Sequence, residues 1–319
     1  MDQTPPYLSS PQAGLRTLSA ALQARGYSFT TVTPATHKTI NARPENFFAR
    51  DMRDVFGWSR PFTPPALDPA LFHAACGAGA AMAAAGGIWR TAVRASTLHG
   101  LLFLHSAFPT DAADAVFFGP DTYRFADAVT RALAARARPI RRALDIGCGS
   151  GAAGIIVARA HPEASVVLAD INRAALALAA VNANAAGLLN TECVQSDLFA
   201  SLRGAFDLIV ANPPYLIDPA TRAYRHGGGQ SGEALSLRIL QESLPHLAPG
   251  GQLVLYTGSA ITAGHDAMHA QAETILAATR WPWAYREADP DVFGEELGRG
   301  AYIHAERIAA IVISVERPA

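Results

Sequence analysis

Leu144-Asp145-Ile146-Gly147-Cys148-Gly149-Ser150-Gly151 is the segment from which the architecture of this chain can be worked out. Its apolar start predicts a short buried strand, and the alanine-rich residues that follow it predict a helix. Glycines at alternate positions in between permit a tight turn and let a ligand come close to the backbone amides. A strand, a glycine-rich turn and a helix in this order are typical of a ligand-binding parallel sheet.

Strands and helices alternate from Ala143 to the end of the chain. The alternation predicts an α/β fold, with helices on both faces of a mostly parallel sheet. The helices between the strands are expected to begin near Ser150, Asn172, Ser231 and Gly264. Seven strands are expected, the last two of them adjacent, at residues 142–146, 165–170, 192–196, 207–211, 252–257, 283–287 and 307–315.

The residues before this alternation have a different pattern. Helical spacing predicts helices at 15–24, 44–55 and 67–82, after a proline-rich tail at 1–12. Two β-rich stretches, Trp89–Ala95 and Leu101–His105, predict a hairpin around Leu98-His99-Gly100. We therefore expect three parts, which are a mainly helical substrate or lid domain at 1–87, a hairpin and linker at 88–125, and the α/β domain at 126–319.

The composition limits what the protein can be. Half of the 319 residues are hydrophobic and 17% are charged, which indicates a globular chain with a large core. Lys and Arg number 26 against 27 Asp and Glu, so a chain-wide basic surface for nucleic acid is absent. Cys76, Cys148 and Cys193 form no CxxC pair, and the ten histidines form no HExxH motif. We expect reduced thiols, a cytoplasmic location, no membrane span and no metal.

Asn212-Pro213-Pro214-Tyr215 is the second informative motif, directly after the apolar run 206–211. It follows the fourth expected strand at the carboxyl edge of the sheet, where ligands of such folds bind. The Asn212 amide oxygen and the Pro213 carbonyl can both accept hydrogen bonds from one NH₂ group, and Tyr215 offers a ring face for stacking. Because the prolines fix the backbone, these acceptors stay in place. The motif predicts a catalytic site that holds a planar nitrogen.

The glycine turn by itself leaves two cofactors open. Gly147-x-Gly149-x-x-Ala152, with Asp170 at the end of the next strand, also satisfies the dinucleotide fingerprint. Asp145 favours S-adenosylmethionine, because a carboxylate suits the cationic amino group of a methionine moiety and sits poorly beside a pyrophosphate.

Residues at the next two strand ends complete the expected S-adenosylmethionine site. Asp170 would accept the ribose hydroxyls, and Asn172 would assist it or cap the following helix. After the third strand, Asp197 can accept from an adenine amino group while Leu198 flanks the ring. The expected site also includes Asp145, Gly147, Gly149, Gly151 and Asn212.

These motifs resemble those of the HemK-type glutamine-amide methyltransferases, over about residues 88–316. That family has a DxGxGxG turn, an Asn-Pro-Pro-Tyr motif and a helical N-terminal domain joined by a β-hairpin. Its Arg-Pro-Glu/Asp-Thr segment is matched by Pro120-Asp121-Thr122, with Gly119 in place of the arginine. The resemblance implies the class I methyltransferase fold, which is Rossmann-like with seven strands. It also implies that this segment, with Phe118 and Thr122, covers the methionine end of the cofactor.

Two loops depart from the family pattern. One is the glycine-rich stretch Tyr224–Gly232, and the other is Asp289–Leu297, with four carboxylates in eight residues. The acidic stretch either binds a cationic substrate or forms a solvated hairpin tip. These departures leave a small amine, amide or nitrogen heterocycle open as the acceptor, beside protein glutamine.

Three alternatives stand beside an N-methyltransferase, namely a guanine-N2 ribosomal RNA enzyme, an S-methylating HemK-like enzyme, and a non-catalytic S-adenosylmethionine-binding protein. An adenine-N6 DNA enzyme needs a basic recognition region, which the sequence lacks. The lipase-like run at 226–229 has no Gly-x-Ser-x-Gly elbow to go with it, which excludes a hydrolase. We therefore expect a small-molecule or protein side-chain acceptor, with neither nucleic acid nor a membrane as partner. The sequence carries no signal of oligomeric state.

Overall fold

The computed structural model describes residues 11–222, 224–298 and 300–319, and its contacts divide the chain into two units. The first unit comprises Met1–Asp111, Val116–Pro120 and Ala180–Gly187. The second comprises Ala112–Ala115, Asp121–Ala179 and Leu188–Ala319. The functional division predicted at residues 87 and 125 stays a proposal, and so does the lid role of residues 1–87.

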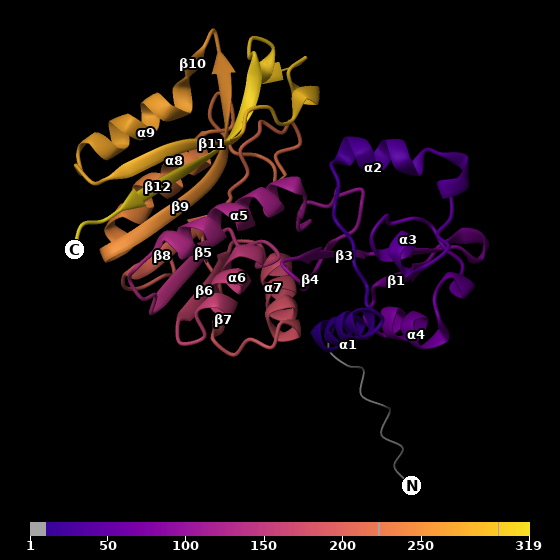
Figure 1. Cartoon of the computed structure of the whole chain (residues 1–319). Helices are drawn as coiled ribbons and strands as arrows, with labels where there is room; N and C mark the ends of the chain where they lie inside the picture. Colours follow the sequence, from indigo (N-terminus) through magenta and orange to yellow (C-terminus); the bar gives the residue numbers. More distant parts are fainter. Residues whose placement is uncertain (1–10, 223, 299) are drawn as a thin grey trace. The chain divides into compact units, whose positions relative to one another are not determined.

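The second unit is built on one large sheet (Figure 1). Its main strands are β5 (Arg142–Ile146), β6 (Ser165–Asp170), β7 (Thr191–Gln195), β8 (Phe206–Ala211), β9 (Leu247–Thr262), β11 (Trp283–Asp289) and β12 (Arg307–Glu316). They lie in the order β11-β12-β9-β8-β5-β6-β7, and the short β10 (His265–Asp266) pairs with β9. Pairing is parallel from β9 to β7 and antiparallel for β11 and β12. The predicted α/β fold, with seven strands and the last two adjacent, is confirmed.

Helices connect these strands. They are α5 (Pro120–Ala135), α6 (Ala152–Ala160), α7 (Arg173–Ala185), α8 (Ala234–Ser243) and α9 (Ala267–Ala277), with short 3₁₀ turns at Leu244–His246, Gly294–Glu296 and Gly300–Tyr302. Leu144, Ile209 and Leu253 of the central strands and Leu276 of α9 share one hydrophobic core. The central strands are buried almost throughout, as parallel strands covered on both faces must be.

The first unit contains α1 (Pro11–Ala24), α2 (Pro34–Asn41), α3 (Met52–Phe56) and α4 (Pro69–Gly77), with 3₁₀ turns at Pro44–Asn46, Pro64–Ala66 and Ala85–Gly87. Two small sheets accompany them, one of β1 (Ala81–Ala83) and β2 (Trp89–Thr91), the other of β3 (Val93–Leu98) and β4 (Leu101–Ser106). The predicted hairpin is confirmed for β3 and β4. Its turn residues, His99 and Gly100, both have positive φ, as a two-residue type I′ turn requires.

Three local predictions for the first unit were wrong. Residues 44–55 do not form one helix, because Asp51 is extended and caps a new helix by accepting from the Asp54 N–H. The helix expected at 67–82 ends at Gly77. The first part of the expected hairpin strand Trp89–Ala95 was also wrong, because Trp89–Thr91 pairs with Ala81–Ala83 and lies outside the hairpin. Helix α2 was not expected. Of the expected tail, residues 1–10 lie outside the described part, and Pro11 already begins α1.

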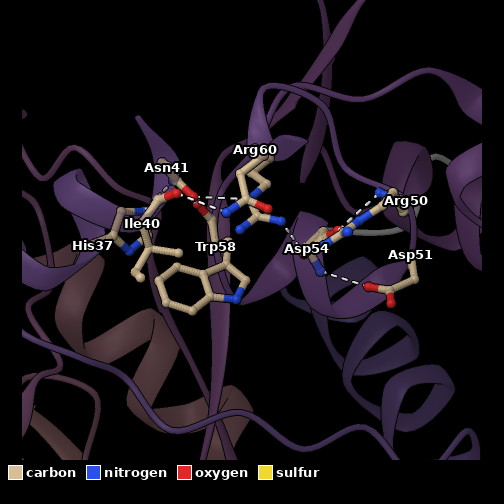
Figure 2. A network of polar contacts seen from close by, with 9 residues as sticks. His37, Ile40, Asn41, Arg50, Asp51, Asp54, Trp58 and Arg60 are labelled. Atoms are coloured by element: carbon tan, nitrogen blue, oxygen red, sulfur yellow. Dashed lines mark hydrogen bonds and ion pairs between the residues drawn. The ribbon is translucent and has the colours of Figure 1, made fainter. Parts of the chain in front are cut away.

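A buried polar network joins α2 to α3 in this unit (Figure 2). Arg60 forms an ion pair with Asp54, and both side chains are almost completely buried. The Arg60 Nε–H donates to Asn41 Oδ1 at 2.9 Å, and Asn41 Nδ2 donates to the Trp58 carbonyl at 2.8 Å. Because each charge has a partner, the network can be buried without an unpaired ion.

No helix among the described residues is long and apolar enough to cross a membrane. In the same part of the chain, no cluster of His, Cys, Asp and Glu side chains is arranged to hold a metal ion. All three cysteines are free thiols.

Candidate active site

The ends of four parallel strands meet at one edge of the sheet in the second unit. In the register, Ile146 of β5 lies between Ala169 of β6 and Ala211 of β8, and Asp170 of β6 lies beside Gln195 of β7. The residues that follow these strands are therefore neighbours at the carboxyl edge, where ligands of open α/β sheets bind. The structure thus brings together Gly147, Gly149, Gly151, Asp170, Asn172, Asp197, Leu198, Asn212 and Pro213.

The three glycines of the turn are there for two different reasons. Gly147, Gly149 and Gly151 all have positive φ, a conformation that other residues adopt only with strain. A Cβ atom added to Gly147 or Gly149 would meet nothing within 4 Å, so open space lies over this part of the turn. A Cβ on Gly151 would instead lie 3.2 Å from the Ala179 side chain. The first two glycines therefore leave room for a ligand, and the third allows helix packing.

Asp170 ties the glycine turn to the end of β6. Its Oδ2 atom accepts from the Gly149 N–H at 2.9 Å, and its Oδ1 atom accepts from the Asn172 N–H at 2.8 Å. Burial raises the pKa of this carboxyl, and the two backbone donors act in the opposite direction. The turn is thus held in shape by a carboxylate that also lies at the ligand edge.

Asp145 lies deeper in the fold than the sequence suggested. It is 1% exposed, and its Oδ2 atom accepts from the Gly154 N–H in the first turn of α6 at 2.8 Å. Burial raises the pKa of the Asp145 carboxyl to about 7, the Gly154 N–H lowers it, and the charge of Asp170 adds to the rise. Its contact with a cationic amino group stays a prediction.

The remaining residues predicted on the cofactor side have partners within the protein. Asn172 Oδ1 accepts from the Ala174 N–H, which caps α7. Asp197 is exposed, and one of its oxygens lies 3.5 Å from Arg238 Nη1. Leu198, with a φ of 46°, packs against the core of the sheet. Their contacts with ribose and adenine stay predictions.

Phe118 and Thr122 fall in different units. Thr122 is buried in the first turn of α5, in the second unit. Phe118 belongs to the first unit, where its ring stacks on His105 with 4.9 Å between centroids. Their role in covering the cofactor stays a prediction.

The Asn-Pro-Pro-Tyr corner (residues 212–215) differs sharply between its two ends. Asn212 is partly exposed, and its side-chain amide has no hydrogen-bond partner within the described residues. Tyr215 is 6% exposed, and its ring meets Tyr256 and Phe293 edge to face. Burial and the charge of Asp121 raise the Tyr215 pKa well above its usual range, so the hydroxyl keeps its proton. The ring of Tyr215 is thus packed inside the protein, and its stacking on an acceptor stays a prediction.

Asp121 is the residue that sequence reasoning missed. Its carboxylate is 6% exposed and accepts from the Tyr215 hydroxyl at 2.6 Å, the Tyr256 hydroxyl at 2.8 Å and Arg124 Nη1 at 3.1 Å. The only signal for it was its place in the Pro120-Asp121-Thr122 segment, and that segment gave no hint of a bond to Tyr215.

The two unusual loops pack around the corner. His226 bridges to Leu216, and the Gly227 N–H donates to the Leu216 carbonyl at 2.8 Å. Tyr302 accepts from the Ile217 N–H at 2.9 Å. In the acidic stretch, Asp289 pairs with Arg124 at 2.7 Å and Glu296 pairs with Arg225 at 2.6 Å. These carboxylates thus serve internal ion pairs, and the glycine-rich stretch lies against the corner.

Residues 122–275 match the family model described as "Methyltransferase small domain". This stretch is similar to a methyltransferase domain. The release factor glutamine methyltransferase of Deinococcus radiodurans is 34% identical over 165 residues, which cover 49% of this chain and 55% of that protein. The ribosomal RNA small subunit methyltransferase C of Pasteurella multocida is 38% identical over 117 residues, which cover 36% of this chain and 32% of that protein.

Among solved structures, wild-type Trm5b from Pyrococcus abyssi shares the fold of this chain, with a TM-score of 0.50 and 14% identity over 75% of this chain and 62% of that one. The predicted class I methyltransferase fold and the resemblance to HemK-type enzymes are confirmed. The matched parts span about half or less of each curated relative.

Proposed function

We propose that this protein transfers the methyl group of S-adenosylmethionine to a planar nitrogen, and that the acceptor is the side-chain amide of glutamine in a protein. The observation that carries the proposal is the pairing of Ile146 with Ala211. This pairing makes the glycine turn and Asn212 direct neighbours at the ligand edge of the sheet.

The glycine turn suits the cofactor. Open space lies over Gly147 and Gly149, and Asp170 lies beside them with two oxygens, each of which has lone pairs left for a ribose hydroxyl. The bound cofactor would supply a methyl group on a sulfonium, which is already a good leaving group. The task left to the protein is to bind, orient and exclude water.

Asn212 and Pro213 suit an amide acceptor. Both offer carbonyl oxygens, and an NH₂ group that donates to two such oxygens is held with its plane fixed. The same oxygens stabilise the positive charge that develops on the nitrogen as it forms its new bond. Since the proton can leave after transfer, no strong base is needed at this corner.

The substrate class rests on the relatives. One matched relative is named for glutamine in a release factor, and another for ribosomal RNA of the small subunit. Protein glutamine fits a corner built to hold an amide, and the formal charge of −1 gives no chain-wide attraction to RNA. A cytoplasmic location, expected from unpaired thiols, is part of this proposal.

The test is methyl transfer from tritium-labelled S-adenosylmethionine to a purified bacterial release factor and, separately, to small ribosomal subunits. We expect label on a release factor glutamine, with Asn212→Ala abolishing turnover and leaving affinity for S-adenosylhomocysteine within several-fold. The exposed Asn184 on α7 gives a matched control, since Asn184→Ala removes the same group elsewhere. Label in RNA would overturn the glutamine acceptor. Cofactor binding with no labelled acceptor would favour a non-catalytic binding protein.

A further inference from the structure

Asp121 connects three elements of the second unit. It is the second residue of α5, and it accepts hydrogen bonds from Tyr215 in the corner and from Tyr256 in β9. Arg124, one helical turn further on, donates to the same carboxylate and pairs with Asp289 at 2.7 Å. Two donors besides Tyr215, namely Tyr256 and Arg124, thus hold this nearly buried carboxylate in place apart from its contact with the corner.

A glycine of β9 leaves the space that the ring of Tyr215 occupies. A Cβ atom added to Gly258 of β9 would collide with the ring carbons of Tyr215. Every other residue at position 258 would therefore push the ring away from the strand. The ring also meets Phe293 edge to face, with 5.8 Å between centroids. Strand β9 and the loop that carries Phe293 thus enclose the ring of Tyr215, and Asp121 accepts a hydrogen bond from the hydroxyl of this ring.

Two more glycines let the loop after the corner pack closely against the corner backbone. A Cβ on Gly227 would lie 2.7 Å from the Pro214 carbonyl oxygen, and a Cβ on Gly232 would collide with the Tyr215 carbonyl. The loop His226–Gly232 therefore needs glycine at these positions to approach the corner. This accounts for the glycine-rich run that the sequence left unexplained.

We propose that Asp121 is a positioning residue that sets the orientation of Asn212 and the Pro213 carbonyl by holding Tyr215. Only two prolines separate Tyr215 from Asn212, and their fixed φ angles transmit a shift of one end to the other. A displacement of the order of 1 Å at a reacting group can cost about 100-fold in rate. The kinetic part of this proposal rests on the proposed function.

The kinetic test compares Asp121→Asn, Tyr215→Phe, the double variant and Tyr285→Phe, with the release factor as acceptor. Tyr285 is the matched control, because its hydroxyl also donates to a carboxylate, Asp266, at 2.7 Å. We expect both single variants to lower kcat about 10- to 100-fold while the KM for S-adenosylmethionine stays within threefold. Since both act through one bond, the double variant should fall no more than twofold below the worse single variant.

If the double variant loses the product of the two single losses in kcat, the proposal is overturned. An unchanged kcat in Tyr215→Phe would also overturn it. A loss of S-adenosylhomocysteine affinity that parallels the loss of kcat would do the same. Tyr285→Phe should keep kcat within twofold.

Hydrogen exchange tests the positioning without any acceptor. The amides of Leu216 and Gly227 are hydrogen-bonded beside the corner, and we expect both to exchange at least tenfold faster in Asp121→Asn and Tyr215→Phe, with no change in Tyr285→Phe. Unchanged exchange would refute the role of Asp121 even if wild-type protein methylates the release factor. Faster exchange in a protein that methylates nothing would leave the positioning intact and refute the proposed function alone. If Asp121→Asn does not fold, Tyr215→Phe supplies both measurements.

Discussion

Replacing Asp170 with alanine should weaken cofactor binding without unfolding the protein. The carboxylate accepts from the Gly149 and Asn172 N–H groups and has lone pairs left to accept from a ligand. A hydrogen bond to a charged group contributes about 1.5–3 kcal/mol. Because each 1.4 kcal/mol is a factor of ten, we expect the dissociation constant of S-adenosylhomocysteine to rise roughly 10- to 150-fold. Titration calorimetry at constant pH measures this directly.

Asp207 provides a matched control for this experiment. It also accepts from two backbone N–H groups, those of Arg141 and Arg142, at 2.8 and 3.0 Å, but it lies at the amino end of β8. Asp207→Ala should therefore cost similar stability in urea denaturation and leave cofactor affinity unchanged. An unaltered dissociation constant in Asp170→Ala, or an equal loss in Asp207→Ala, would refute the assignment of Asp170 to the cofactor.

Two further predictions concern stability. The pKa of Asp145 is raised from about 4 to about 7, so the folded state favours the protonated acid, and the stability that this contributes is present below pH 4 and lost as the pH rises towards 7. Asp145→Asn should remove this loss and stabilise the protein at pH 8 by up to a few kcal/mol. If the urea midpoints of wild type and variant differ by the same amount at every pH from 5 to 8, this expectation is contradicted. Gly258→Ala should destabilise the protein by about 1–3 kcal/mol, because the added Cβ meets the Tyr215 ring. Gly294→Ala is the control and should cost under about 1 kcal/mol, since its Cβ would meet nothing within 4 Å. Equal melting temperatures of the two variants would exclude the clash.

Most strands of the large sheet could be predicted to within one or two residues. Strands 142–146 and 165–170 have the predicted bounds, because a short apolar run between turn residues has few other ways to be buried. Strand β9 runs from Leu247 to Thr262, well beyond the predicted 252–257, since its long partner β12 supplies pairing that local pattern does not reveal. In the first unit, cap residues such as Asp51 and Thr33 decide where helices begin, and they outweigh a weak apolar stripe.

That the candidate site residues lie together at one edge of the sheet could be predicted, and their roles stay predictions. Because parallel strands end at one edge, Asn212 and the glycine turn had to come together. The partners of Tyr215 could not be inferred, since Asp121 is 94 positions away in the sequence and belongs to a helix before the first strand of the sheet. The burial of Asp145 could not be inferred either, because it depends on how α6 packs against the sheet.

The contact of α5 with the corner matters for anyone who trims this protein. The family match starts at residue 122, and a fragment designed to that boundary or to residue 126 would omit the carboxylate on which two tyrosine hydroxyls converge. Such a fragment would keep the glycine turn and the Asn-Pro-Pro-Tyr corner but lose the carboxylate that we propose orients this corner. Expression clones of the α/β part should therefore start upstream of Pro120.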